Sequence, residues 1–332
     1  MKTIFFEVQD WEQELLKHVF PDALLVEDKF DSTIISKYAD AEIISCFIYS
    51  RLNKEIIDQM PRLKCIATRS TGYDHIDVEY CKQKGIVVCN VPEYGSRTVA
   101  EYTFALMLMV SRKMYDSVTQ LKECNFDHKK LMGFDLFGKT IGIVGLGKIG
   151  IEVLKIAQGF GMKVLANAHT QKPELAQQYQ FTYVSLDELL QQSDIVTLHL
   201  PAIKETTHII NTQNVLNFKK GAILINTARG PLVQTEAILT GLEKGILSGV
   251  GLDVLEEETN LTEEAQLLSS HSTSAADFKT MCMDHVLINH PNVVATPHNA
   301  FNSQEALLRI TNTTIDNIQN YLSGKLENTN QI

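Results

Sequence analysis

The glycine-rich turn GLGKIG is the feature that most constrains the fold of this chain. It follows the apolar run 141–144 and precedes a helical pattern at 149–160. In such a strand–turn–helix unit the first glycine permits the tight turn, the second lets the backbone approach a diphosphate, and the third allows close helix–strand packing. The helix start adds unpaired N–H groups and the positive end of its dipole. The pattern predicts a dinucleotide site at Gly145, Gly147 and Gly150, although glycines at such a turn can also be purely structural.

Short apolar runs alternate with helical patterns through the rest of this half of the chain. One helix is expected to begin at Leu186, because Ser185 and Glu188 form a capping box. Strands that alternate with helices form a doubly wound parallel sheet, so the predicted fold class is α/β. The predicted strands of this half are 140–144, 163–166, 181–184, 195–200, 222–226, 250–254 and 293–295.

The first hundred residues alternate in the same way and predict a second parallel sheet. An almost unbroken apolar stretch at 98–112 predicts a long buried helix that joins two lobes or packs between subunits. An amphipathic helix at 304–322 is expected to return to the first lobe, which would make that lobe discontinuous in sequence. The remaining predicted elements are strands 3–8, 43–46, 65–68 and 86–89 and helices 54–60 and 78–84.

The polar segment 256–290 interrupts this alternation. It is rich in Ser and Thr and has one helical run near 263–268. We interpret it as an insertion beside the cleft.

Composition and charge exclude several classes of partner. A chain of 332 residues suits two domains with a cleft, and 44% apolar with 21% charged residues is typical of a globular protein. The net charge of -10 repels phosphate backbones and anionic lipids, so nucleic acid and membrane surfaces are not expected as partners. Anionic small molecules can still bind locally.

The N-terminus and the cysteines predict a cytoplasmic protein. The apolar run at the start ends at Glu7, too short for a signal peptide, and no stretch approaches the roughly 20 apolar residues of a membrane span. The six cysteines form no CxxC pair and no zinc spacing, which indicates reduced thiols and no metal site.

The residues after the strand 163–166 leave the choice between NAD and NADP open. An acidic residue normally binds the ribose hydroxyls here, but Ala168 stands where it is expected. Without that negative charge a 2′-phosphate is not repelled, and His169 and Lys172 could attract one. Alternatively, Asn167 bonds the ribose and the basic residues are merely solvated.

Three residues after predicted strands suit the reduction of a 2-oxo acid. Arg229 can grip a carboxylate with paired donors, His298 can protonate the carbonyl oxygen, and Glu258 can keep that histidine charged. Taken singly, an arginine in a loop is more often a surface residue, and a histidine is more often a structural polar group with its hydrogen bonds satisfied. Together, and with the glycine turn upstream, they indicate an enzyme.

These residues and several motifs resemble the D-isomer-specific 2-hydroxyacid dehydrogenase family. The resemblance covers nearly the whole chain and implies a Rossmann cofactor domain inserted in a smaller flavodoxin-like substrate domain, as a homodimer held through the long helix. The implied domains are 1–99 plus 299–332 for the substrate and 100–298 for NAD(P). The motifs are RSTGYD from Arg69, NVPEY from Asn90, VAE from Val99, HLP from His199 and TARG from Thr227.

The family implies a role for each matching residue. Arg229 orients the substrate, His298 is the acid/base, Glu258 stabilises the imidazolium, and the backbone N–H groups of Thr71 and Gly72 bind the carboxylate. The residues implied in cofactor binding, besides the three glycines and 167–169, are Lys148, Ile149, His199, Pro201, Thr206, Thr227, Ala228 and Asp253.

Within the family, three aromatic residues resemble those lining the site of D-lactate dehydrogenases. Tyr49, Tyr94 and Phe301 would form a small pocket that suits a methyl group, unless Tyr49 and Phe301 are core residues. Pyruvate/D-lactate is therefore the first expectation, ahead of bulkier 2-oxo acids, glyoxylate, hydroxypyruvate and phosphite. The alternative from another class is a non-catalytic NAD(H)-sensing scaffold like the corepressors of this fold, which would not need Arg229, Glu258 and His298.

Overall fold

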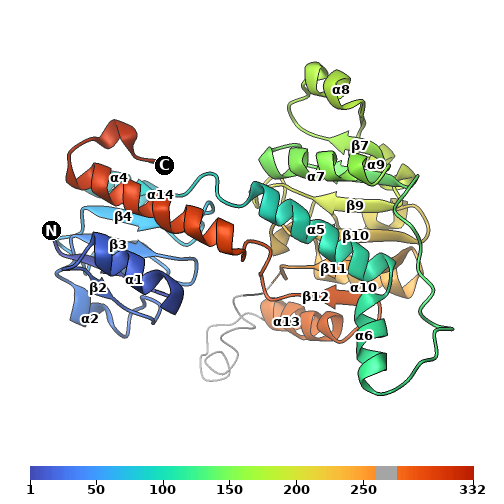
Figure 1. Cartoon of the computed structure of the whole chain (residues 1–332), viewed down its shortest axis with the longest axis horizontal. Helices are drawn as coiled ribbons and strands as arrows, with labels where there is room; N and C mark the ends of the chain where they lie inside the picture. Colours follow the sequence, from blue (N-terminus) through green and yellow to red (C-terminus); the bar gives the residue numbers. More distant parts are fainter. Residues whose placement is uncertain (257, 259–274) are drawn as a thin grey trace. The chain divides into compact units, whose positions relative to one another are not determined.

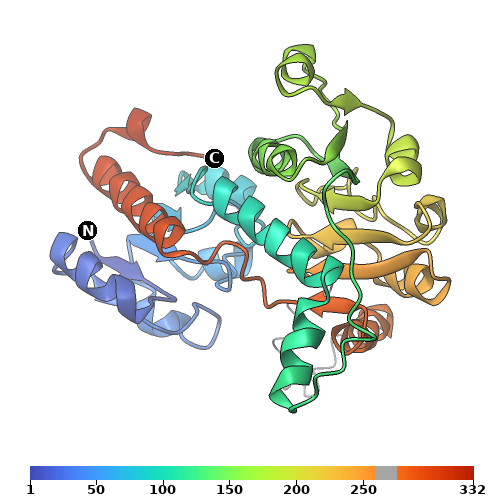
Figure 2. The ribbon, with the colours of Figure 1, turned by 45° about the vertical axis from the view of Figure 1, so that its right-hand side comes forward.

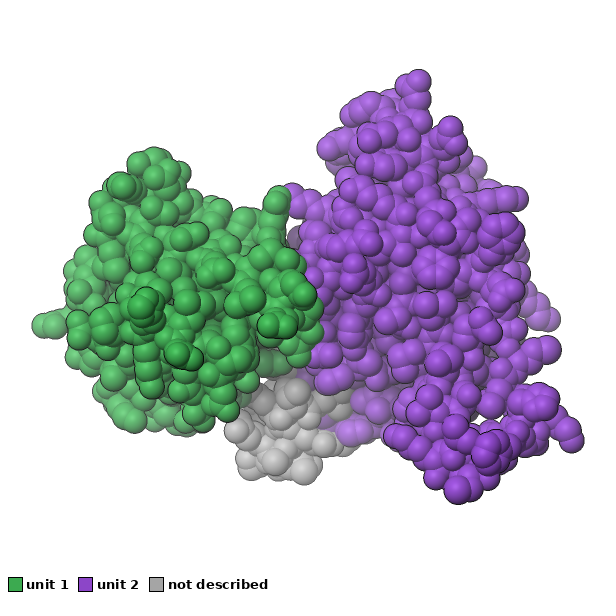
Figure 3. Space-filling model, in the orientation of Figure 1, with its two compact units in different colours: residues 1–94, 302–332 green, residues 95–301 purple. Residues whose placement is uncertain are grey.

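The computed structural model describes residues 1–256, 258 and 275–332 (Figure 1). They form two compact units, which Figure 3 shows in different colours. Met1–Tyr94 and Asn302–Ile332 make up the first unit, and Gly95–Phe301 makes up the second.

The first unit contains a five-stranded parallel sheet with the order β2-β1-β3-β4-β5. Helices α1 (Asp10–Val19) and α14 (Gln304–Leu322) pack against one face. The other face packs against α2 (Ile35–Tyr38), α3 (Lys54–Ile57) and α4 (Val78–Lys84). The strands are β1 Thr3–Phe5, β2 Leu24–Leu25, β3 Ile43–Cys46, β4 Cys65–Thr68 and β5 Val87–Cys89.

Both faces of this sheet are covered, which explains why its strands are mostly apolar, with Thr3, Ser45 and Thr68 as polar exceptions. Successive side chains of a strand point to opposite faces, so Ile4 enters one buried cluster and Phe5 the other. Helix α14 comes from the far end of the sequence and lies along this sheet (Figures 1 and 2). The first unit is therefore discontinuous in sequence.

The second unit contains a seven-stranded parallel sheet with the order β12-β11-β10-β9-β6-β7-β8. Helices α5 (Ser96–Ser111) and α7 (Lys148–Gly159) cover one face, and α8 (Pro173–Tyr179) packs at the edge of that layer. The strands are β6 Thr140–Val144, β7 Lys163–Asn167, β8 Thr182–Tyr183, β9 Ile195–Leu198, β10 Ala222–Asn226, β11 Leu247–Leu252 and β12 Val293–Ala295.

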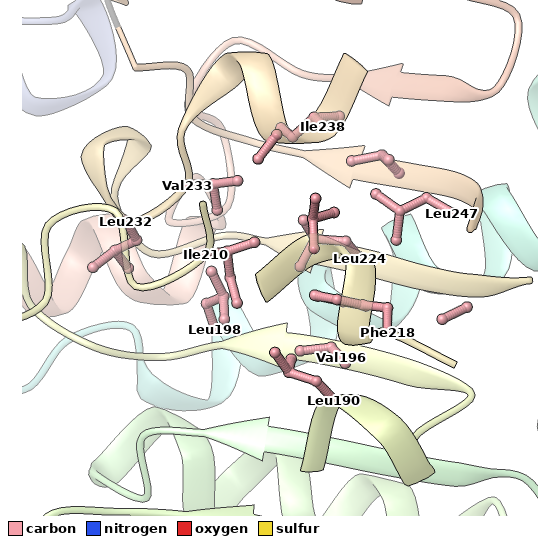
Figure 4. Packing of buried hydrophobic residues seen from close by; sticks show 14 of the residues in the cluster. Leu190, Val196, Leu198, Ile210, Phe218, Leu224, Leu232, Val233, Ile238 and Leu247 are labelled. Atoms are coloured by element: carbon pink, nitrogen blue, oxygen red, sulfur yellow. The ribbon is translucent and has the colours of Figure 1, made fainter. Parts of the chain in front are cut away.

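The opposite face of this sheet carries the larger buried cluster, part of which Figure 4 shows. Helices α9 (Leu186–Gln192), α10 (Thr235–Glu243) and α13 (Ala275–Ile288) supply its outer side chains, such as Leu190, Ile238 and Leu287. The sheet supplies the inner ones, such as Val196 and Leu224. Helix α6 (Met114–Lys122) and the turns η1 (Asn214–Asn217) and η2 (Gly230–Leu232) also belong to this unit, and η3 (Leu326–Asn328) lies near the chain end.

The predicted α/β class, the Ser185 capping box and the helix 304–322 are confirmed. Helix α1 was not predicted, because a glutamate, Glu12, occupies one of its buried positions (2% exposed) and hides the apolar period. The interpretation of 256–290 as an insertion is wrong for its second half. That half forms α13, which connects the parallel strands β11 and β12. The exposed Val286 and Ile288 of this helix obscure the helical pattern of apolar residues in the sequence. The run expected near 263–268 lies outside the described residues.

No helix among the described residues has the length and apolar character needed to cross a membrane. Within the same part of the chain, no group of three or more His, Cys, Asp or Glu side chains is placed to hold a metal ion. All six cysteines carry free thiols.

Candidate active site

The glycine turn joins β6 to α7 and leaves room at the start of that helix. Gly145 has φ +97°, and a Cβ on it would lie 2.4 Å from the carbonyl oxygen of His199. A Cβ on Gly150 would lie 2.2 Å from the carbonyl oxygen of Gly145. A Cβ on Gly147 would meet no described atom within 4 Å. Packing therefore requires the first and third glycines, whereas the second faces open space.

This open space fits a dinucleotide diphosphate. Helix α7 begins at Lys148, and Gly147 provides no side-chain cap for its first turn. N–H groups in a first turn have no partner within the helix and bind anions with the help of the dipole. Strand order also reverses between β6 and β9, which is where open α/β sheets bind ligands.

The end of β7 offers no acidic side chain to a ribose. Asn167 donates from Nδ2 to the carbonyl oxygen of Val184 (3.0 Å), and its own carbonyl oxygen accepts the N–H of Gly145 (2.8 Å). Ala168 is half-buried and His169 is exposed. Asn167 therefore connects β7 to the glycine turn and to the end of β8. Its side-chain Nδ2 already donates a hydrogen bond within the protein.

His199 follows β9 and stays neutral. Its Nε2 lies 3.0 Å from the hydroxyl of Thr197, while its Nδ1 is buried with no partner among the described residues. Burial lowers the pKa of His199 to about 3. At neutral pH the imidazole of His199 is therefore uncharged.

Two predicted cofactor contacts already bond to the protein through their hydroxyl groups. Thr206 Oγ1 donates to the carbonyl oxygen of Pro201 (2.6 Å) and so closes the turn after β9. Thr227 Oγ1 lies 2.8 Å from Thr103 Oγ1 on α5. Both interactions shape loops that follow strands of the sheet.

The loop that carries Arg229 is held by an asparagine that sequence analysis did not identify. Asn226, buried at the end of β10, donates to the carbonyl oxygen of Arg229 (2.9 Å) and accepts the N–H of Ala228 (3.0 Å). Arg229 Nη1 donates to the carbonyl oxygen of Ala228 (2.7 Å). A Cβ on Gly230 would lie 1.8 Å from the carbonyl oxygen of Leu255, so the loop packs directly on the chain after β11.

His298 and Glu258 form a pair. His298 Nδ1 lies 2.9 Å from Glu258 Oε1. A carboxylate only accepts hydrogen bonds, so Nδ1 carries the proton of this bond and Nε2 is left for proton transfer. His298 has φ +50°, a conformation that is uncommon for residues other than glycine. The backbone after β12 thus bends sharply to present this imidazole.

Asp253 holds the His298 loop through four hydrogen bonds. Its Oδ1 accepts the hydroxyl of Thr296 (2.6 Å) and the N–H of Asn299 (2.8 Å), and its Oδ2 accepts the N–H of Ala300 (2.8 Å). The carbonyl oxygen of Asp253 accepts the N–H of His298 (2.9 Å). Burial raises the pKa of Asp253, which is 1% exposed. The carboxylate therefore has a structural role in positioning His298, whatever it contributes to the cofactor.

In the first unit, Thr71 and Gly72 lie on a braced loop after β4. The hydroxyl of Thr71 donates to the carbonyl oxygen of Val91 (2.7 Å), and the carbonyl oxygen of Thr71 accepts from Asn90 Nδ2 (2.9 Å). Ser70 Oγ donates to the carbonyl oxygen of Gly72 (2.6 Å). These bonds fix the loop from both sides.

The predicted aromatic residues are not core residues. Tyr49, after β3, is 51% exposed, and Tyr94, after β5, and Phe301 are half-buried. The carbonyl oxygen of Tyr94 accepts from Arg309 Nε on α14 (2.7 Å).

Each sheet gathers its predicted site residues at one edge. Arg229, Glu258 and His298 follow β10, β11 and β12, which are neighbours in the second sheet. The substrate candidates of the first unit follow β3, β4 and β5, which are neighbours in the first sheet. Because the strands of each sheet are parallel, their carboxyl ends meet at one edge, where such sheets bind ligands.

Comparison with known proteins identifies the family. The family model "D-isomer specific 2-hydroxyacid dehydrogenase, NAD binding domain" matches residues 104–300. A 2-hydroxyacid dehydrogenase homolog of Zymomonas mobilis is 33% identical, with 98% of each chain covered. A glyoxylate reductase of Thermococcus onnurineus is 36% identical over 78% of this chain and 76% of its own.

Solved structures agree with these matches. D-lactate dehydrogenase of Aquifex aeolicus, in complex with NAD and lactic acid, superposes with a TM-score of 0.88 at 34% identity, covering 100% of this chain and 99% of that one. The pyruvate reductase of Chlamydomonas reinhardtii gives a TM-score of 0.87 at 31% identity, with 98% and 97% covered. The second unit is thus a Rossmann-type NAD-binding domain, and the chain belongs to the D-isomer-specific 2-hydroxyacid dehydrogenase family.

Proposed function

We propose that this enzyme reduces a small 2-oxo acid to the D-2-hydroxy acid, with pyruvate as the first candidate substrate. The observation that carries the proposal is the 2.9 Å pair of His298 and Glu258 at the same sheet edge as Arg229. A corepressor-like scaffold would need the glycine turn but not this pair. The names of the Aquifex and Chlamydomonas proteins support pyruvate/D-lactate.

Each residue has a distinct task in the proposed reaction. Arg229 and the N–H groups of Thr71 and Gly72 hold the substrate carboxylate, which presents the carbonyl group in one orientation. NADH, when bound, supplies the hydride for the carbonyl carbon. His298 gives the proton on Nε2 to the carbonyl oxygen, and Glu258 stabilises the imidazolium before that transfer. Oxidation of the D-hydroxy acid returns the proton to His298.

The aromatic residues Tyr49, Tyr94 and Phe301 are proposed to enclose the substrate side chain. Aromatic rings around that side chain would suit the methyl group of pyruvate. Glyoxylate is the second candidate, because the chain is 36% identical to the glyoxylate reductase of Thermococcus onnurineus. Hydroxypyruvate and bulkier 2-oxo acids follow.

A panel of 2-oxo acids tests the function. We expect the highest kcat/KM with NADH for pyruvate, followed by glyoxylate and then hydroxypyruvate. A clear preference for glyoxylate would replace pyruvate by the second candidate. Tight NADH binding without turnover of any 2-oxo acid would support a sensing scaffold instead.

For the cofactor, we propose NAD, with weaker discrimination against NADP than an acidic residue at position 168 would give. Ala168→Asp is expected to raise the NADH/NADPH ratio of kcat/KM by at least about tenfold, because one charged hydrogen bond to the ribose contributes about 1.5 kcal/mol or more. The same carboxylate would repel a 2′-phosphate.

Ala168→Asn is the matched control, because it offers a hydrogen bond without the charge and should leave most of the NADPH activity. The measurement is kcat/KM for both cofactors at equal ionic strength. If the wild type already rejects NADPH by several orders of magnitude, another group binds the ribose and this interpretation of residues 167–172 is wrong.

We also propose that the protein is a homodimer. The reason is that the second unit exposes large apolar side chains that a second copy of the chain could bury. They lie on α6 and on the extended segment that follows it in Figure 2. Phe126 is 81% exposed, Met132 85% and Phe137 80%. Such side chains mark an interaction surface, and a second copy of this chain would cover them. Light scattering should give twice the chain mass of 37.3 kDa, whereas a monomer at micromolar concentration would refute the proposal.

A further inference from the structure

Glu7 combines three unfavourable features, which points to a function beyond stability. It follows β1 at the carboxyl edge of the first sheet and has φ +57°, a region that residues with a Cβ rarely adopt. It is 7% exposed, and burial raises the pKa of its carboxyl group. Strained and desolvated residues persist where the surrounding structure needs them, often at functional sites.

The carboxylate of Glu7 binds the loop that follows β3. Oε2 accepts the backbone N–H of Phe47, and Oε1 accepts the N–H of Tyr49 at 2.8 Å. The two rings of this loop also contact each other edge to face, with centroids 6.3 Å apart. The Tyr49 ring is half exposed, so packing against the core fixes its position only in part. The two hydrogen bonds from Glu7 fix the backbone from which this ring extends.

The backbone of Glu7 is held in turn by the strand on the far side of β3. Arg69, directly after β4 and 2% exposed, donates from Nη2 to the carbonyl oxygens of Phe6 (2.6 Å) and Glu7 (2.8 Å). Its Nη1 donates to Ser45 Oγ on β3 (3.2 Å), and Glu12 Oε1 lies 3.5 Å from Nη2. The ends of β1, β3 and β4 are thus joined through one arginine and one glutamate.

We propose that Glu7 is a positioning residue that sets the place of Tyr49 and thereby the size of substrate side chain that the enzyme accepts. This inference rests on the proposed function, in which Tyr49 lines the space for that side chain. Only a carboxylate presents two acceptor oxygens to two N–H groups and carries no donor of its own. A glutamine would face one of the two N–H groups with its own NH₂ group and lose that bond.

Glu7→Gln tests the proposal through substrate selectivity. The readout is the ratio of kcat/KM for pyruvate to that for 4-methyl-2-oxopentanoate, both with NADH. We expect this ratio to fall at least about fivefold, since one methylene group in an apolar pocket changes kcat/KM by about 10–200-fold. The KM for pyruvate should rise more than kcat falls, and the Kd of NADH should not change, because the predicted NADH contacts lie in the second unit.

Glu42→Gln is the matched control. Glu42 also accepts a backbone N–H, from Lys2 at 3.0 Å, and an ammonium group, from Lys64 at 2.7 Å, but it precedes β3 and lies at the opposite edge of the sheet. This variant should keep the wild-type ratio. If Glu7→Gln does not fold, Glu7→Asp withdraws both oxygens by one methylene and should lower the ratio in the same direction.

A second background separates positioning of Tyr49 from a general loss of structure. In Tyr49→Ala, adding Glu7→Gln should leave the ratio within about twofold, because the ring through which Glu7 acts is gone. A folded Glu7 variant with the wild-type ratio would overturn the proposal, and so would an equal fall of the ratio in the Tyr49→Ala background. Failure of the proposed function looks different, since the wild type itself would then turn over no 2-oxo acid.

Discussion

Replacement of His298 by alanine is expected to lower kcat for pyruvate reduction by at least about 100-fold, because general acid catalysis contributes about 10²–10⁴. The Kd of NADH should stay within a few-fold of wild type, since the predicted diphosphate site at Gly147 uses backbone N–H groups of α7. Steady-state kinetics measure kcat, and NADH fluorescence titration measures the Kd.

The matched control is His128→Ala, because His128 is exposed and bonds to no predicted site residue. It should keep wild-type turnover. Glu258→Gln should be slower than wild type, because a neutral amide stabilises the imidazolium less than a carboxylate does. Near-normal turnover of His298→Ala would remove the acid/base assignment, since His199 is neutral and could not replace it.

Arg229→Lys is expected to raise KM for pyruvate and lower kcat together, with a fall in kcat/KM of about 10–100-fold. An ammonium cannot reproduce the paired donors of a guanidinium, and one charged hydrogen bond contributes about 1.5–3 kcal/mol. Asn226 bonds to the backbone of Arg229, so the loop should keep its shape in the variant.

Arg97→Lys serves as the control, because Arg97 makes an exposed ion pair with Glu101 on α5 and such pairs contribute little. Steady-state kinetics over a range of pyruvate concentrations distinguish the two variants. Unchanged KM and kcat in Arg229→Lys would show that another cation holds the carboxylate.

Much of the fold could be predicted because its strands lie inside covered sheets. Buried parallel strands such as β10 are apolar except for the terminal Asn226, and the long α14 has an apolar stripe, so both elements can be recognised in the sequence. The pattern failed at α1, where the buried Glu12 interrupts the stripe, and at α13, where apolar residues are exposed. In both cases tertiary contacts decide what the local sequence leaves ambiguous.

The candidate site could be predicted only where a residue carries chemistry of its own. Arg229, Glu258 and His298 have reactive or charged side chains directly after predicted strands, and this combination identifies them as site candidates. Asn226 and Glu7 act on the backbone of other loops, in the case of Glu7 on residues 40 and 42 positions away. No local pattern in the sequence records such contacts, so they became visible only in the folded chain.

Analysis of the product on a chiral column tests the central claim most directly. The purified chain, supplied with pyruvate and NADH, should form D-lactate in an amount equal to the NADH consumed. Formation of L-lactate, or the absence of NADH oxidation with every 2-oxo acid of the panel, would contradict the account.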